Sequence, residues 1–167
     1  DAMIPFFNPS GVQEILDYGL FGIHLSRKSG CWVGIKCVHD NVSSGATVDL
    51  NENRFSIKDI NSEIVPEEGL NIRLNDTPQA KEHRLHYHKI KVVKEFCKIN
   101  KLNEIKYNFP NSKIGVVTTG KSYLDTKLAF EKIGIDENLA KQIGIKFLKI
   151  AMPWPLEESI IKEFSEG

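Results

Sequence analysis

The chain has 167 residues, enough for one hydrophobic core or for one domain and part of another. Lysine and arginine together number 22, as do aspartate and glutamate, so the sequence offers no broad basic surface for nucleic acid and no acidic tail. No apolar run approaches the roughly 18 to 20 residues that cross a bilayer, and no secretory signal is recognisable, so we expect a cytoplasmic protein that binds neither membrane nor nucleic acid.

The cysteines and histidines predict no metal site. The three cysteines are Cys31, Cys37 and Cys97. They are an odd number without a C-x-x-C spacing, which argues against a disulfide framework, a zinc knuckle or a self-contained iron–sulfur site. His83 and His86 lie one turn apart on a predicted helix, whereas His88 is predicted to lie on another face. We therefore expect reduced, mostly buried cysteines and histidines on a polar helix surface.

The first forty residues predict a β-α-β unit. An apolar run at residues 4–7 precedes the breaker NPSG, and Ser10 with Gln13 forms a capping-box pair for a helix. One apolar stripe at helical period then contains Val12, Ile15, Leu16, Gly19 and Ile23. Gly30 is a natural residue to end this helix, and the apolar run 31–38 predicts a buried strand parallel to the first.

Residues 39–81 change in character, because Gly, Ser, Asn, Asp and Pro become frequent. Apolar bursts at residues 46–50 and 54–57 alternate in a way that favours edge strands or a hairpin. A structureless loop of this length would be unusual inside one compact domain, so we place a boundary here. Helical patterning returns at residues 81–100, where Ile90, Val93 and Cys97 form an apolar face.

The last third predicts a regular α/β alternation. Residues 113–119 read as a strand, Ser122 is predicted to cap a helix that buries Leu124, Leu128 and Ala129, and Gly134 ends it. Asp136 should cap a shorter helix that ends at Gly144, followed by a strand at 145–151 and a final helix from about residue 156. The alternation stops before the next expected strand, which predicts a piece excised from a longer chain.

A short motif in this region resembles a nucleotide-binding P-loop. Residues Gly115 to Ser122 read G-x-x-x-x-G-K-S. In a P-loop an open loop begins at about the first glycine, but here Gly115 lies inside an apolar run whose β-branched residues favour a strand. No acidic residue ends the later strand to hold magnesium. We therefore reject nucleotide hydrolysis.

The same turn leaves a second hypothesis open. Gly120, Lys121 and Ser122 lie where a strand passes into a helix, so free N–H groups and an ammonium could contact an anion. The alternative interpretation is simple helix capping with a solvated lysine. No Ser-His-Asp order, nucleophile elbow or carboxylate pair is recognisable, so no catalytic residue and no metal ligand are assigned.

Several stretches resemble a known family. They are VTTGKSYLD, GIDENLAKQIGIKFLKIAMPWPLEESIIKEFSEG, GLNIRLNDTPQAKEHRL and SRKSGCWVGIKCVHDNVSS. Taken in their order along the chain, they are similar to the indolepyruvate ferredoxin oxidoreductases, which belong to the thiamine-diphosphate-dependent 2-oxoacid:ferredoxin oxidoreductases, and in particular to a part of the fused bacterial form. The resemblance covers nearly the whole chain and is more specific than the eight-residue motif.

The resemblance implies a parent enzyme that decarboxylates an aryl-2-oxoacid oxidatively, transfers the acyl unit to coenzyme A and reduces ferredoxin. It implies thiamine diphosphate, magnesium and iron–sulfur clusters for the parent but none in this chain, and a parent that is a homodimer. It also implies an α/β fold of parallel-sheet units: residues 1–50 end the thiamine pyrimidine-binding domain, 51–110 connect, and 111–167 form an incomplete transketolase-C-terminal-like domain. We expect the isolated chain to be structural and inactive. The rival hypothesis is a stand-alone α/β binding module that uses the turn at Gly120 to Ser122.

Overall fold

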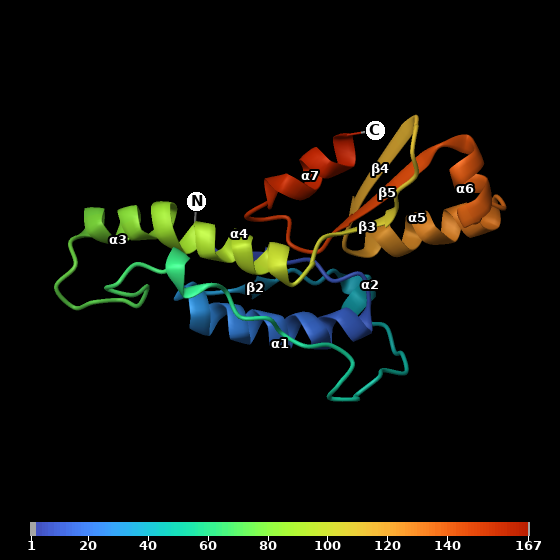
Figure 1. Cartoon of the computed structure of the whole chain (residues 1–167). Helices are drawn as coiled ribbons and strands as arrows, with labels where there is room; N and C mark the ends of the chain where they lie inside the picture. Colours follow the sequence, from blue (N-terminus) through green and yellow to red (C-terminus); the bar gives the residue numbers. More distant parts are fainter. Residues whose placement is uncertain (1–2, 167) are drawn as a thin grey trace.

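The computed structural model describes residues 3–166 and shows an α/β protein with two small sheets (Figure 1). The predicted β-α-β unit is present. It consists of β1 (Phe6–Phe7), α1 (Val12–Ser29) and β2 (Gly34–Ile35), followed by the short helix α2 (His39–Val42). The two strands are parallel, with Phe6 opposite Gly34 and Phe7 opposite Ile35. β2 is shorter than predicted because β1 offers only two residues for pairing.

The two ends of α1 are determined by local chemistry. The helix begins after Gly11, and both the backbone N–H and the hydroxyl of Ser10 donate to Glu14 Oε2 at 2.8 Å. The capping partner of Ser10 is therefore Glu14, and the prediction of Gln13 was wrong, because Gln13 instead bonds Asp17 and the backbone of Asp49. Gly30 ends the helix at φ 66°, as predicted.

The buried face of α1 is not the predicted one. Tyr18, Phe21 and Leu25 face the core, whereas Leu16 and Ile23 of the predicted stripe are 41% and 55% exposed. The helix is apolar on two sides, so helical periodicity alone could not choose between them. The choice follows from packing, because Phe21 lies edge-on to Phe96 of the neighbouring helix α4 (Ile90–Ile99) and stacks on Phe55.

The middle segment crosses the outside of α1. Apart from the short 3₁₀ helix η1 (Ser62–Ile64), residues 43–77 contain no regular element, so the predicted hairpin at 46–57 is absent from the described chain. The segment forms hydrogen bonds with side chains of α1 instead of pairing with a strand. Arg54 donates to Asp17 at 2.6 Å, and Asp49 N–H donates to Gln13 at 2.7 Å. This segment therefore covers α1 without adding a strand to either sheet.

A continuous helical rod leads into the second sheet. It comprises α3 (Pro78–Arg84), a π-helical turn η2 (Leu85–Lys89) and α4. Thr77 caps α3 by accepting from Ala80 N–H. The apolar side of α4, including the predicted Val93 and Cys97, is buried against α1.

The second sheet has the order β3-β5-β4. Its elements are β3 (Glu104–Tyr107), β4 (Ile114–Thr119), α5 (Lys121–Lys132), α6 (Glu137–Ile143), β5 (Ile145–Ile150) and α7 (Glu158–Ser165). β4 and β5 are parallel, but β3 is antiparallel to β5, so the sheet is mixed. β3 lies within the range predicted as a connecting segment, and the C-terminal sheet consequently starts at Glu104 instead of at about residue 111.

Helices α5 and α7 cover opposite faces of this sheet (Figure 1). Tyr123 and Phe130 of α5 pack on Phe147, while Phe164 of α7 lies against Gly115, where it leaves no room for a side chain. The predicted apolar side of α5 was wrong, because Leu124 and Leu128 are 43% and 49% exposed and the aromatic residues are the ones that contact the sheet.

The two sheets are joined into one core. After β5 the chain runs back along β1, where Phe6 N–H donates to the Trp154 carbonyl at 2.9 Å and Asn8 N–H donates to the Ala151 carbonyl at 2.8 Å. Side chains from both halves share a single cluster. Its members include Phe7, Leu25, Phe96, Leu102, Ala151 and Met152. The end of β1 therefore lies beside the end of β4, where the turn at Gly120 begins.

Candidate functional site

The P-loop pattern lies in regular strand. Every residue from Ile114 to Thr119 is paired with β5, from Ile114 opposite Ile145 to Thr119 opposite Ile150. The backbone here is extended and aligned with the neighbouring strand, and it does not form a loop that could surround a triphosphate. The structure therefore supports the rejection of nucleotide hydrolysis.

The turn at Gly120 is closed by a residue from the other sheet. Gly120 has φ 57° and ψ −143°, a conformation that only glycine adopts easily. A Cβ atom here would lie within 2.7 Å of the Asn8 side-chain amide, whose nitrogen donates to Thr119 Oγ1 at 3.1 Å. Asn8 thus occupies the space in front of the glycine.

The charged group of this turn is neutralised inside the chain. Lys121 Nζ lies 2.7 and 2.8 Å from the two oxygens of Asp125 and 3.7 Å from Asp40. The hydrogen bond to Asp125 raises the pKa of Lys121, and the charge of Asp40 adds to this effect. Ser122 does not cap the helix: α5 begins at Lys121 after Gly120, with no side-chain cap. An anion at Gly120, Lys121 and Ser122 stays a prediction, and this geometry disfavours it because an anion would face two carboxylates.

A buried ion pair beside this turn was not found by sequence reasoning. Lys149 of β5 is only 6% exposed, contacts the carboxylate of Glu14 and lies 4.5 Å from the centre of the Tyr123 ring. Burial lowers the pKa of Lys149 to about 8. The pair connects α1 to the second sheet. Its one indication in the sequence is a lysine within an apolar run that is predicted to be a strand.

The histidine cluster differs from its prediction. The π-turn inserts one extra residue, so His88 lies beside His83, with ring centres 5.8 Å apart, and not on another face. His83 also stacks on Tyr87 at 4.5 Å, and His86 lies 4.0 Å from Glu82. Among residues 3–166, no group of three or more histidine, cysteine, aspartate or glutamate side chains could hold a metal ion.

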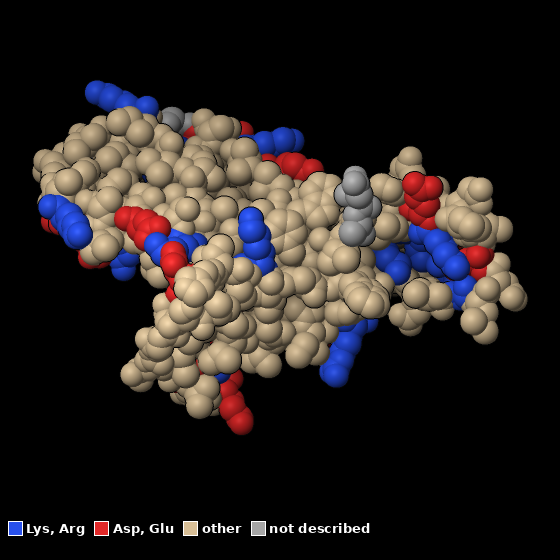
Figure 2. Space-filling model, turned by 180° about the vertical axis from the view of Figure 1, so that it is seen from behind, with Lys and Arg blue, Asp and Glu red and all other residues tan. Residues whose placement is uncertain are grey.

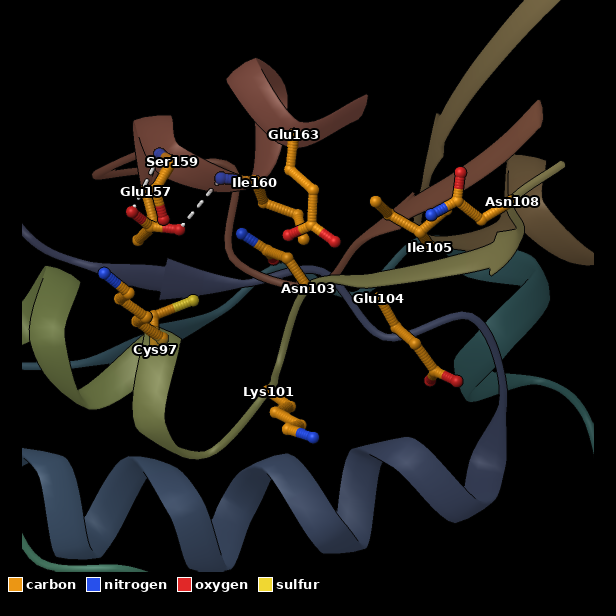
Figure 3. A pocket seen from close by; sticks show the side chains of 11 residues that line it. Cys97, Lys101, Asn103, Glu104, Ile105, Asn108, Glu157, Ser159, Ile160 and Glu163 are labelled. Carbon is orange, nitrogen blue, oxygen red and sulfur yellow. Dashed lines mark hydrogen bonds between the residues drawn. The ribbon is translucent and has the colours of Figure 1, made fainter. Parts of the chain in front are cut away.

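A cavity of about 400 Å³ lies between the end of α4, β3 and the start of α7 (Figure 3). Its wall includes Cys97, Asn103, Ile105, Glu157, Ile160 and Glu163. Asn103 and Glu157 are buried, and Glu157 caps α7 by accepting from the N–H groups of Ser159 and Ile160 at 2.8 and 3.2 Å. This cavity was not predicted, because one of its walls comes from α7, which is distant in the sequence from α4 and β3.

Comparison with known proteins shows which family the chain is similar to. Residues 105–167 match the family model of the indolepyruvate oxidoreductase domain. The chain also aligns over 99% of its length with indolepyruvate oxidoreductase subunit IorA of Pyrococcus abyssi, at 25% identity over 170 residues, and of Pyrococcus horikoshii, at 25% over 175 residues. The chain is thus similar to the indolepyruvate oxidoreductase family, over its C-terminal part by the family model and over nearly its whole length by these relatives. The corresponding subunit of Thermococcus kodakarensis is 24% identical over 172 residues.

The family confirms the resemblance predicted from the four sequence stretches. The chain spans about a quarter of the length of these relatives, since it covers 25% of each. These relatives are named as subunits, so an origin in the fused bacterial form stays a prediction. A solved structure, 2-oxoglutarate:ferredoxin oxidoreductase from Magnetococcus marinus with 2-oxoglutarate, coenzyme A and succinyl-CoA bound, is 15% identical with a TM-score of 0.57. It matches 96% of this chain and 32% of its own, which supports the α/β fold.

The residues of this chain do not fit an iron–sulfur cluster or a metal-bound cofactor. Cys31, Cys37 and Cys97 are all free, and Cys31 and Cys97 are buried while Cys37 is exposed. The described residues provide no set of metal ligands. Among residues 3–166 no helix is both long and apolar enough to cross a membrane.

Proposed function

We propose that this chain is a structural part of a longer indolepyruvate ferredoxin oxidoreductase. In this proposal the complete enzyme oxidatively decarboxylates aryl-2-oxoacids, transfers the acyl unit to coenzyme A and reduces ferredoxin, and its thiamine diphosphate, magnesium and iron–sulfur clusters are held by other parts. The observation that carries the proposal is the alignment of 99% of this chain with one quarter of relatives named indolepyruvate oxidoreductase subunit IorA. Coenzyme A, ferredoxin and a second copy of the parent are the partners of that complete enzyme.

The surface of the chain supports a role inside a larger assembly. Seen from behind, a broad area of the molecule carries few charged side chains (Figure 2). Helices α1 and α5 both expose apolar residues on the side that faces away from the core, including Leu16, Ile23 and Leu128. Exposed apolar side chains on a weakly charged face are a feature of surfaces that contact other protein.

The internal pairing of polar groups supports a structural role for the strand ends. Lys121 is held by Asp125 and Asp40, and Lys149 by Glu14. Catalytic and binding groups at the ends of parallel strands would instead have to face a substrate. We propose that residues 1–50 end the pyrimidine-binding domain and that the C-terminal sheet, with β3 included, belongs to the transketolase-C-terminal-like domain.

An activity assay tests the proposal. The complete enzyme and the isolated chain are incubated with indolepyruvate, coenzyme A and oxidised ferredoxin, and ferredoxin reduction is followed by absorbance. We expect turnover by the complete enzyme and none by the isolated chain. Turnover by the isolated chain would overturn its structural assignment, and a complete enzyme that is inactive toward every aryl-2-oxoacid would overturn the proposed reaction.

A further inference from the structure

The cavity between α4, β3 and α7 contains a buried hydrogen-bond donor with no acceptor. Asn103 is only 7% exposed, and its Oδ1 accepts from the N–H groups of Ala151 and Met152 at 2.9 and 3.1 Å. These two bonds determine the orientation of the amide, because the nitrogen could not accept in their place. Asn103 Nδ2 has no hydrogen-bond partner within the described chain, and such buried donors are uncommon.

The free donor faces a ligand-sized space. Asn103 lines the cavity of about 400 Å³, and Figure 3 shows its nitrogen on the side of Glu157 and Ile160. Ile105 and Ile160 contribute apolar surface to the same wall. A concave site that combines apolar side chains with a few polar groups is typical of small-molecule binding.

The cavity is lined by the carboxylates of Glu157 and Glu163 on the side of Asn103; Lys98 and Lys101 line it as well, and the Lys101 ammonium points away from Asn103 (Figure 3). Glu157 is 9% exposed and is held by backbone N–H groups, and within residues 3–166 no cationic side chain forms an ion pair with it. Glu163 directs its carboxylate toward Asn103 (Figure 3). The pKa of the Cys97 thiol agrees with this arrangement, because burial, together with a smaller effect from the charge of Glu157, raises it to about 12.

These observations define the ligand chemistry. Asn103 Nδ2 requires an acceptor, while Glu157 and Glu163 favour a cationic donor a few ångströms away. We infer that this cavity binds the ammonium end of a small molecule that carries an adjacent carbonyl oxygen, the chemistry of α-amino acids and their amides. The carbonyl oxygen accepts from Asn103, the ammonium faces the two carboxylates, and an aliphatic side chain packs on Ile105 and Ile160. This site is independent of the thiamine-dependent reaction.

Small molecules that each lack one functional group test the site without any change to the protein. L-leucinamide is titrated into the full chain, and binding is followed by calorimetry and by the NMR signals of the Asn103 side-chain amide. We expect a shift of those signals at up to about 10 mM ligand, a range that detects millimolar affinity. N-acetyl-L-leucinamide lacks the ammonium and 3-methylbutylamine lacks the carbonyl, and each is expected to bind about tenfold more weakly. L-leucine, with a carboxylate in place of the amide, shows whether the free acid is also accepted.

A protein variant and its control complete the test. Glu163→Gln removes one carboxylate from an exposed position of α7 and should weaken the binding of L-leucinamide about twofold to fivefold. Glu131→Gln makes the same change on α5, away from the cavity wall, and should leave the affinity unchanged. The inference is overturned if neither L-leucinamide nor L-leucine moves the Asn103 amide signals, or if the acetylated compound binds as well as L-leucinamide. None of these outcomes depends on oxidoreductase activity.

Discussion

Replacing Gly120 by alanine tests whether the turn of Gly120, Lys121 and Ser122 stabilises the contact between the two sheets. Gly120 has φ 57° and ψ −143°, and an added methyl group would lie within 2.7 Å of the Asn8 amide. Asn8 belongs to the first sheet and Gly120 to the second, and the Asn8–Thr119 hydrogen bond of 3.1 Å connects them. The substitution therefore affects both the local backbone and the contact between the halves.

Two contributions determine the expected size of the effect. A non-glycine residue in this backbone region costs about 1–3 kcal/mol. Displacement of Asn8 removes its hydrogen bond to Thr119, which contributes about 0.5–1.5 kcal/mol. We therefore expect Gly120→Ala to lower the free energy of unfolding by about 2–4 kcal/mol, a large part of the roughly 5–15 kcal/mol that stabilises a domain.

Urea unfolding followed by circular dichroism measures this change. Gly134→Ala is the matched control, because Gly134 also has a positive φ, 76°, but an added methyl group would contact nothing within 4 Å. It should cost only about 1–2 kcal/mol of backbone strain. In an Asn8→Ala background the clash is removed, so the two substitutions should be non-additive by about 1 kcal/mol or more. Equal effects of Gly120→Ala and Gly134→Ala would refute the reasoning.

Three further predictions concern the stability of single elements. Gly19→Ala should raise the free energy of unfolding by about 0.5–1 kcal/mol, because Gly19 lies inside α1 and a methyl group meets nothing within 4 Å; a lower melting temperature would contradict this. Asp136→Ala should cost about 1 kcal/mol by removing the 2.8 Å bond from Leu139 N–H, whereas Asp136→Asn should retain most of it in the same urea assay. The hydrogen bond from Arg84 holds the pKa of Asp76 below its ordinary value. This pair therefore stabilises the fold above the ordinary carboxyl pKa of about 3.9, and its contribution is lost as the pH falls through the lowered pKa. An NMR titration should show the Asp76 midpoint rising in Arg84→Gln, and an unchanged midpoint would disprove the assignment.

Local signals predicted the elements whose boundaries depend on short-range chemistry. Gly30 and Gly144 end helices in the left-handed conformation, and Asp136 caps α6, because each of these functions needs only neighbouring residues. The β-branched run after Gly115 likewise predicted β4 and excluded a P-loop, since strand propensity acts over a few residues. The family was also predictable, because resemblance depends on sequence order alone.

Packing decided which of several apolar faces became the core. α1 could have buried Leu16 and Ile23, yet Tyr18 and Phe21 are buried because aromatic residues of α4 and of the crossing segment lie on that side. β3 has little apolar character of its own. It forms a strand by pairing with β5, which is distant in the sequence. A helical period identifies stripes but not the neighbour that each stripe meets.

The amino-acid sequence by itself determined the α/β alternation and the helix ends, because these follow from interactions between residues that are close along the chain. The tertiary structure alone decided that Asn8 closes the Gly120 turn, that Lys149 meets Glu14, and that Asn103 faces a cavity with a free donor. The hydrogen bonds that create these three features join residues about 50 to 135 positions apart in the sequence. How the sheets and helices pack decides which distant residues meet.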